Sequence, residues 1–180
     1  MQFLIPLIYL LLAFFILWVA ISFRNASKSF APFVPCEKKE LPRIFEVIAL
    51  KDNEIFYDLG CGDGRVVFYA ARNFKSKAIG IELSLLFFLY SWVKRIFSRD
   101  KSNITFKLKN LFHEDLSKAD AIYVYGMPRV LEKRLRYKLE KELKEGARVI
   151  AYGFPIKGLN PESIRRPDEK HKKSIYLYRF

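Results

Sequence analysis

Short apolar runs alternate with longer amphipathic stretches along residues 37–180. Mostly apolar runs of about four to eight residues are typical of strands, and apolar residues spaced three or four apart are typical of helices. The runs predict strands at Ile55–Leu59, Ala78–Ile81, Ile104–Leu108, Ala121–Tyr125, Arg148–Tyr152 and Ser174–Phe180. The spacing predicts helices at Glu37–Leu50, Arg65–Asn73, Leu85–Phe97 and Arg129–Glu145.

Strands that alternate with helices predict an α/β fold, in which a mostly parallel sheet is covered on both faces. The last run, SIYLYRF at residues 174–180, alternates apolar and polar positions with a period of two. We expect it to close an edge of the sheet as an antiparallel strand. The expected architecture is therefore one Rossmann-like domain at residues 37–180.

The first 23 residues are the most apolar segment, since Phe3–Phe23 contains 21 residues without a charged side chain. A helix of this length rises about 30 Å, which matches the hydrocarbon core of a bilayer. A cleaved signal peptide is the alternative, but it would have a basic start and a shorter apolar core. We therefore expect one transmembrane helix, an anchor at residues 1–23.

Basic residues follow this segment at Arg24 and Lys28, and none precedes it. The positive-inside rule then predicts a single-pass protein with its amino terminus outside and its domain in the cytoplasm. Residues 24–36 contain two prolines, which interrupt a helix, so we expect a linker or lid there. A prokaryotic plasma membrane is the preferred location. A mitochondrial inner membrane is the alternative, although its proteins normally carry more basic sequence ahead of the span.

The chain is basic, with 32 Lys and Arg against 19 Asp and Glu and a formal net charge of +13. This balance favours a negatively charged partner, either nucleic acid or an anionic membrane surface. The cysteines Cys36 and Cys61 and the histidines His113 and His171 lack the spacing of metal ligands. No metal site is expected.

The predicted helix at Leu85–Phe97 is apolar on nearly all sides. Such a helix is typical of a domain interior, so we expect it to be buried. Alternatively, one face contacts the bilayer surface, with Lys94 and Arg95 at the headgroups. A basic cluster near the carboxyl terminus is expected either to meet phosphate groups or to form a plain exposed loop. Its members are Arg165, Arg166, Lys170, Lys172 and Lys173.

Three glycines crowd into the segment FYDLGCGDGR at residues 56–65, between a predicted strand and a predicted helix. Glycine lets a ligand approach backbone atoms with no side chain in the way, which is typical of nucleotide-binding turns. The dinucleotide fingerprint requires a third glycine at the position of Arg65. The turn therefore argues against a nicotinamide dinucleotide.

Acidic side chains around this turn suit a cationic ligand. Asp58 and Asp63 lie beside the glycines, and Glu82 ends the second strand, where a carboxylate can accept hydrogen bonds from both ribose hydroxyls. Asn110 follows the third strand and could bond to an adenine edge. S-adenosyl-L-methionine carries an ammonium and a sulfonium and no pyrophosphate. The arrangement therefore predicts S-adenosyl-L-methionine as the cofactor.

Several segments resemble known sequences: PFVP at 32–35, DLGCGDGRVV at 58–67, AIGIEL at 78–83, YGMP at 125–128, LEKELKEGARVIA at 139–151 and FP at 154–155. The glycine turn resembles the class I, seven-strand S-adenosyl-L-methionine-dependent methyltransferases. Together the segments resemble the membrane-anchored ATP synthase c-subunit lysine N-methyltransferase family. The resemblance covers most of residues 30–161.

The resemblance implies that the acceptor is a lysine nitrogen of a membrane-associated protein, such as an ATP synthase c-subunit. The chain departs from the family's usual residues at Cys36, Asn110, Gly153 and Leu159, which leaves the protein substrate open. The positions expected to contact the cofactor are Asp58, Gly60, Cys61, Gly62, Asp63, Gly64, Glu82, Asn110 and Leu111.

A lysine amine must lose its proton before it can attack a methyl group, although its ordinary pKa is about 10.4. An apolar slot favours the neutral amine by desolvation, and aromatic faces attract a sulfonium and a methylated ammonium. The expected walls of this slot are Phe33, Pro35, Tyr125, Pro128 and Phe154. Tyr125 is the expected catalytic residue, because its hydroxyl could orient the amine.

Other functions remain open at this point. A lipid or small-molecule amine methyltransferase would also suit a tethered site, and a non-catalytic cofactor-binding sensor would keep the same glycine turn. A nucleic-acid substrate is disfavoured, because YGMP stands where enzymes that act on base amines carry an N-P-P-Y-like motif.

Overall fold

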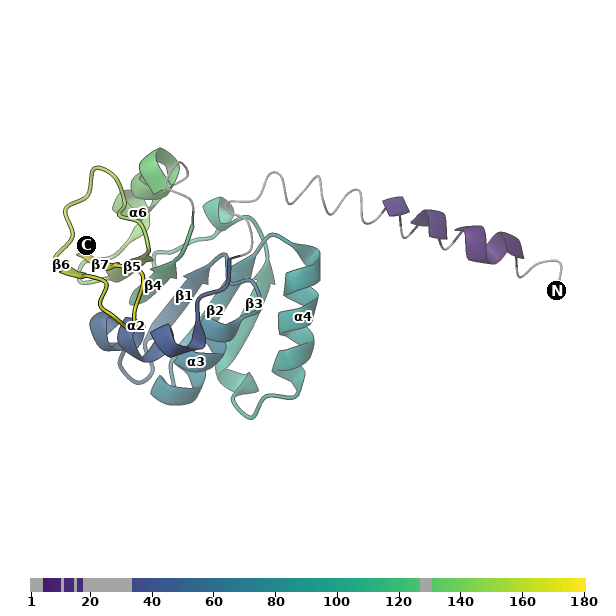
Figure 1. Ribbon diagram of the computed structural model, residues 1–180, viewed down its shortest axis with the longest axis horizontal. Helices are drawn as coiled ribbons and strands as arrows, with labels where there is room; N and C mark the ends of the chain where they lie inside the picture. The colour runs from purple at the N-terminus through teal and green to yellow at the C-terminus, as the bar shows by residue number, and fades with distance from the viewer. Residues whose placement is uncertain (1–4, 11, 15, 18–33, 127–130) are drawn as a thin grey trace.

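A computed structural model describes residues 5–10, 12–14, 16–17, 34–126 and 131–180 of the chain. Its centre is a sheet of seven strands in the order β3-β2-β1-β4-β5-β7-β6 (Figure 1). The strands are β1 (Ile55–Leu59), β2 (Lys77–Glu82), β3 (Ile104–Leu108), β4 (Ala121–Val124), β5 (Arg148–Tyr152), β6 (Ser163–Arg165) and β7 (Ile175–Arg179). Strands β1 to β5 run parallel, whereas β7 is antiparallel to both β5 and β6.

The helices follow the predicted order. They are η1 (Lys38–Glu40), α2 (Leu41–Ile48), α3 (Arg65–Phe74), α4 (Leu85–Ile96), η2 (Lys101–Asn103), η3 (Leu111–His113), the π-helical turn η4 (Leu131–Leu135) and α6 (Arg136–Glu142). The mostly parallel Rossmann-like sheet is thus confirmed, and the predicted strands match the observed ones closely.

One strand differs from the prediction. The run at residues 174–180 forms β7, but it lies between β5 and β6 and does not close the edge. The edge strand is β6, which has three residues, all exposed. So short a run has no apolar alternation, and only its pairing with β7 makes it a strand.

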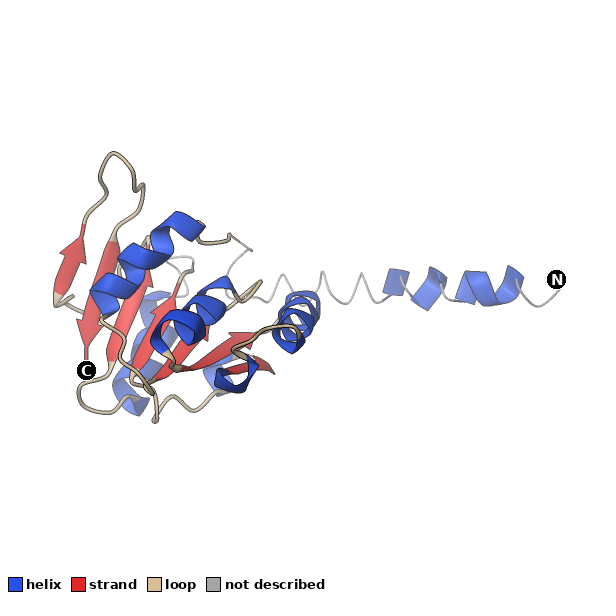
Figure 2. Ribbon diagram, turned by 90° about the horizontal axis from the view of Figure 1, so that it is seen from below, coloured by secondary structure: helices blue, strands red, loops and turns tan. Residues whose placement is uncertain are grey.

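Helices cover both faces of the sheet and bury two apolar cores (Figure 2). Helices α2 and α3 cover one face, where the rings of Phe45 and Phe74 stack with their centroids 5.2 Å apart. On the other face, Leu135 and Leu139 pack into the second core, in which the amide of Ile156 donates to the hydroxyl of Tyr178 at 2.8 Å. Near-continuous apolar strands such as β4 and β5, buried at every residue, are what a sheet covered on both faces requires.

Helix α4 is not buried, contrary to the expectation for the apolar stretch at Leu85–Phe97. The structure describes every residue of this helix, and of these Ser91 alone is buried. The helix packs against β2 and β3, and β3 forms the edge of the sheet opposite to β6, so no further described element covers its outer face. Its exposed large apolar side chains are Leu85, Leu86, Leu89, Tyr90, Trp92, Val93 and Ile96, followed by Phe97 beyond its end.

The amino-terminal prediction can be compared only in part. Helical backbone is described at residues 5–10, 12–14 and 16–17, and the rest of the predicted span Phe3–Phe23 lies outside the described residues. Within the described part of the chain, no helix has both the length and the apolar character needed to cross a bilayer.

The register places the candidate site residues together at the carboxyl ends of the parallel strands. Leu59, the last residue of β1, pairs with Ile81 of β2 and with Val124 of β4. The residues that directly follow, which are the glycine turn, Glu82 and Tyr125, therefore emerge side by side at the carboxyl ends of three adjacent strands. Ligands of open parallel sheets bind at these carboxyl ends.

Gly64→Ala is expected to destabilise the protein more than Gly146→Ala. Both glycines have left-handed backbone, with φ of 73° and 81°, and a side chain there costs about 1–2 kcal/mol. A Cβ at Gly64 would lie 2.7 Å from Cζ of Phe106, whereas a Cβ at Gly146 would meet no described atom within 4 Å. Overpacking should therefore add roughly 1–3 kcal/mol at Gly64 alone. Denaturant unfolding measures the difference, and equal losses in the two variants would contradict the expectation.

Candidate cofactor and acceptor site

Hydrogen bonds attach the glycine turn to the end of β2. The amides of Gly60 and Cys61 donate to the carbonyl oxygen of Ile81 at 2.9 and 3.0 Å, and the amide of Gly62 donates to Glu82 at 2.8 Å. The amide of Gly64 donates back to Cys61 at 2.9 Å. A pyrophosphate needs free amides pointing at it, and these four already have partners within the protein. The geometry thus agrees with the sequence argument against a dinucleotide.

The side chain of Cys61 faces inward. A Cβ on Gly80 would lie 2.7 Å from its Sγ, so the turn packs directly against β2. Burial raises the pKa of Cys61 well above its ordinary value, and the nearby carboxylates act in the same direction. Only the backbone of Cys61 is placed to meet a ligand.

Asp58 is the most deeply buried acid of the site. Its side chain is 2% exposed, and its Oδ2 has no hydrogen-bond partner among the described residues. Burial raises the pKa of Asp58 well above its ordinary value, and the negative charges of Glu82 and Asp63 raise it further. A buried carboxyl without a partner is costly, and a cationic ligand would relieve that cost. This feature fits the ammonium of S-adenosyl-L-methionine.

Asp63 has a partner already. The Arg65 guanidinium donates to both carboxylate oxygens, from Nε at 2.9 Å and from Nη2 at 2.6 Å. Although partial burial raises it, these bonds hold the pKa of Asp63 below its ordinary value. The negative charge of Asp63 is therefore balanced within the protein, and Asp58 is the better candidate for facing a cation.

Glu82 is held at the carboxyl end of β2. Its Oε2 accepts from Gly62 and its Oε1 accepts from the amide of Ser84 at 2.7 Å. On the neighbouring strand, Asn110 follows β3 and its Oδ1 accepts from the amide of Phe112 at 3.0 Å, which caps η3. Leu111 is buried behind it. The structure thus brings the predicted ribose and adenine positions to adjacent strand ends.

The described end of the predicted lid lies beside the glycine turn. Arg65 donates from Nη1 to the carbonyl oxygen of Cys36 at 2.7 Å, and Pro35 is exposed just before it. Burial raises the pKa of the Cys36 thiol to about 11, and Glu40 and Asp58 act in the same direction. Phe33, predicted for the acceptor slot, lies outside the described residues.

An aromatic pair lies where β4 and β5 end. The rings of Tyr125 and Tyr152 meet edge to face, with centroids 5.1 Å apart at 70°. Phe154 follows β5 and is 40% exposed, so it can border a slot without filling it. Tyr152 was not predicted as a site residue, although its place at the end of an apolar strand could have indicated it. Pro128 lies outside the described residues.

Lys173 reaches the same place from the carboxyl-terminal segment. Its Nζ donates to the hydroxyl of Tyr125 and lies 4.5 Å from the centroid of the Tyr125 ring and 5.7 Å from that of Tyr152. The members of the basic cluster, which was predicted either to meet phosphate groups or to form an exposed loop, therefore lie in different environments. Arg165 pairs with Glu46 at 2.9 Å near the surface, whereas Lys173 turns toward the site.

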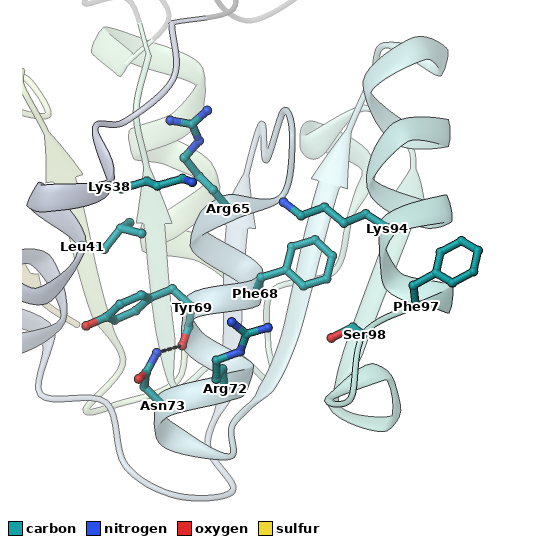
Figure 3. Close-up of a pocket in the computed structure, with 10 residues that line it drawn as sticks. All are labelled: Lys38, Leu41, Arg65, Phe68, Tyr69, Arg72, Asn73, Lys94, Phe97 and Ser98. Carbon is teal, nitrogen blue, oxygen red and sulfur yellow. Dashed lines mark hydrogen bonds between the residues drawn. The ribbon is translucent and has the colours of Figure 1, made fainter.

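A groove of about 630 Å³ lies elsewhere, between α3 and α4 (Figure 3). Helix α3 supplies Arg65, Phe68 and Arg72, and α4 faces them with Lys94, whose Nζ lies 4.5 Å from the centroid of the Phe68 ring. The described residues that line this groove include no carboxylate. Arg65 and Arg72 pair with Asp63 and Asp100, and Lys38 and Lys94 add further positive charge. This excess of positive charge suits an anionic ligand and disfavours the cationic cofactor, which we assign to the acidic turn. Among the described residues, no group of three His, Cys, Asp or Glu could hold a metal ion.

Affinity for the demethylated cofactor, S-adenosyl-L-homocysteine, is expected to rise with pH. In the free protein Asp58 stays protonated at pH values above its ordinary pKa of about 3.9. The ligand's ammonium favours the ionised carboxylate, so binding releases that proton. Affinity should increase by up to about tenfold per pH unit until the pH exceeds the raised pKa of free Asp58, and then level off.

Calorimetry in two buffers of different ionisation enthalpy measures both the affinity and the released proton. Asp58→Asn should abolish the proton release and weaken binding, whereas Asp115→Asn, at an exposed position where the carboxylate accepts from the amide of Ser117, should change neither. An affinity independent of pH in the unaltered protein would contradict the assignment of Asp58.

Comparison with known proteins gives concordant matches. The family model described as the ANTKMT methyltransferase domain matches residues 58–163. The chain is 35% identical to the protein-lysine N-methyltransferase of Saccharolobus islandicus over 82% of this chain and 92% of that protein. It is 29% identical to the human ATP synthase c-subunit lysine N-methyltransferase over 74% of this chain. That match spans only 56% of the human protein.

A solved structure agrees in fold. The RNA methyltransferase from Salinibacter ruber, in complex with S-adenosyl-L-homocysteine, superposes with a TM-score of 0.75 and 27% sequence identity. The superposition covers 81% of this chain and 93% of that protein.

Proposed function

Because the chain belongs to the family of the ANTKMT methyltransferase domain, we propose that it methylates a lysine side chain of a membrane-associated protein. Family membership confirms the predicted methyltransferase activity and its cofactor, S-adenosyl-L-methionine. The observation that carries the lysine acceptor is the 35% identity to a protein-lysine N-methyltransferase along 92% of that protein.

The site has two parts, one that binds the cofactor and one that binds the acceptor amine. When bound, the cofactor supplies a methyl group on a positively charged sulfur. We assign the ammonium of the cofactor to Asp58, the ribose hydroxyls to Glu82 and the adenine edge to Asn110. At the acceptor end, Tyr125 orients the incoming amine through its hydroxyl, and the aromatic rings of Tyr125 and Tyr152 exclude water from it. Holding the two reactants in line is the main catalytic contribution.

The membrane part of the proposal rests on two apolar features, one of the sequence and one of the structure. The first is the uncharged sequence Phe3–Phe23, which we propose as the anchor of residues 1–23, followed by a linker at 24–36 and the catalytic domain at 37–180. The second is the exposed apolar face of α4. The positive-inside rule favours a cytoplasmic domain. We propose a prokaryotic plasma membrane as its location, with a mitochondrial inner membrane as the alternative.

The charges around α4 also support a contact between its exposed face and a membrane. The groove beside α4 carries Lys38 and Lys94 besides Arg65 and Arg72, which pair with Asp63 and Asp100. Arg99 and Lys101 are exposed just after the end of the helix. Apolar side chains bordered by cations are typical of a helix that lies in the interface of an anionic membrane. Arg95, predicted to meet headgroups, instead donates from Nε to the carbonyl oxygen of Ile104 at 2.5 Å.

The substrate class is tested by incubating the full chain with isotope-labelled S-adenosyl-L-methionine and native membranes, and then separating protein, lipid and RNA. We expect label in a small apolar protein, recovered as methylated lysine after hydrolysis. Label in lipid would favour the lipid-amine alternative, and label in RNA would favour the substrate named for the Salinibacter ruber enzyme. No label in any fraction, despite binding of the cofactor, would favour a non-catalytic sensor.

In the same assay, Tyr125→Phe should lower the rate roughly ten- to a hundredfold, because the amine loses its orienting hydroxyl. Affinity for S-adenosyl-L-homocysteine should stay unchanged. Tyr137→Phe, on α6 and 66% exposed, is the matched control and should retain full activity. Full turnover by Tyr125→Phe would remove Tyr125 from the mechanism.

Replacing Leu89, Trp92, Val93 and Ile96 together by Ser should weaken binding to anionic liposomes by at least about tenfold, since each buried apolar side chain contributes roughly 1.5–3 kcal/mol. These four are exposed, whereas Phe88 packs partly against the core and would confound the test. Co-sedimentation of a fragment of residues 34–180, with folding checked by circular dichroism, measures the effect.

The control for this experiment is Tyr137→Ser, an exposed apolar position on α6. It should leave liposome binding unchanged. If the fourfold variant binds liposomes as well as the unaltered fragment does, α4 does not contact the membrane.

A further inference from the structure

The segment that carries Lys173 is attached to the domain by a buried arginine. Arg43 on α2 is 7% exposed, and its guanidinium donates to three backbone carbonyls of the segment. The acceptors are the carbonyl oxygens of Lys173 at 2.9 Å, Arg166 at 2.6 Å and Arg165 at 3.2 Å. We call residues 165–174 the strap.

Further bonds hold the strap from both sides. Glu40, 1% exposed, pairs with Arg43 at 3.1 Å and with Nδ1 of His171 at 2.7 Å. On the sheet side, the amide of Gly153 donates to the carbonyl oxygen of Ser174 at 2.8 Å. The backbone on each side of Lys173 is therefore fixed, and the direction of its side chain follows from that position.

The Lys173 side chain passes over Gly153 to reach the aromatic pair. A Cβ at Gly153 would lie 3.3 Å from Cε2 of Tyr125 and 3.6 Å from Cδ of Lys173, so a side chain at this position would crowd Tyr125 and touch Lys173. The Lys173 ammonium then lies against the hydroxyl and ring of Tyr125 and near the ring of Tyr152. These are the groups that suit an alkylammonium, and the proposed substrate offers the same chemical group.

We propose that Lys173 is an internal occupant of the acceptor site and that the lysine of the protein substrate must displace it. The inference rests on the proposed function, because it takes Tyr125 and Tyr152 as the walls of the acceptor slot. One small slot cannot hold both side chains, and while both are protonated their like charges also repel each other. An incoming lysine therefore binds only to molecules in which the Lys173 side chain has moved away.

The expected size of the effect follows from the occupancy. If Lys173 fills the slot in about nine of ten molecules, the apparent affinity for a lysine side chain falls about tenfold. The strap stays in place while this exchange occurs, because Arg43 and Gly153 bind its backbone and not the Lys173 side chain.

Binding of n-butylammonium to the cofactor-free full chain tests the inference without any catalysis. Chemical shifts of the Tyr125 and Tyr152 rings report the binding by NMR. Lys173→Ala should tighten it about tenfold, and Lys173→Met, which keeps the apolar stem, should tighten it also. Lys172→Ala is the matched control, since its side chain is exposed, and it should change nothing. Unchanged or weaker binding in both Lys173 variants would overturn the proposal.

Activity with native membranes gives the second readout. In the Lys173→Ala variant the KM for the protein substrate should fall several-fold, and kcat should not. A loss of kcat with an unchanged KM would make Lys173 a residue that positions Tyr125, and would overturn the inference. If the unaltered chain labels no protein while the n-butylammonium result holds, the proposed function fails and the ammonium site stands.

Discussion

The hydrogen bonds between the glycine turn and the end of β2 are the constraint on which the site depends. They place the backbone of Gly60 and Gly62 against Ile81 and Glu82, and they leave Asp58 buried at the end of β1 with an oxygen that has no partner in the described part of the chain. The turn thereby presents carboxylates rather than free amides to a ligand. A turn of similar outline with free amides would attract phosphate, so the partner of each amide decides the sign of the charge that can bind.

The acceptor end is organised by a second buried group, the ion pair between Glu40 and Arg43. Removing one member of such a pair leaves an uncompensated charge in the interior, which is costly, so the pair is a permanent part of the fold. Because Arg43 binds strap carbonyls, this pair also determines where Lys173 enters the site. One long side chain on a fixed backbone can then exchange with a ligand without any movement of the sheet.

Charge is distributed unevenly over the molecule, and this asymmetry connects the site to its surroundings. Carboxylates gather at the glycine turn, while the groove between α3 and α4 is lined by cations. A cationic cofactor and an anionic membrane surface would therefore bind at different places without competing. The exposed apolar face of α4 lies next to the cationic groove, which is the arrangement expected of a surface that contacts lipid headgroups and acyl chains together.

The parallel strands, the glycine turn and the acids Asp58 and Glu82 could all be predicted from the amino-acid sequence. These features are local, since a buried strand, the turn that follows it and the first polar residue at its end are all specified within a few neighbouring positions. The acids around the turn predicted the cofactor, and the resemblance of several such segments to a methyltransferase family pointed to the same one.

Which of these residues face one another, by contrast, depends on the folded chain. Helix α4 is apolar in either environment, and its exposure follows from the position of β3 at the sheet edge. The β6 strand exists only through its pairing with β7, and Lys173 meets Tyr125 across 48 positions of sequence. Edge position, strand pairing and long-range contacts arise from the packing of distant segments, and no local pattern in the chain records them.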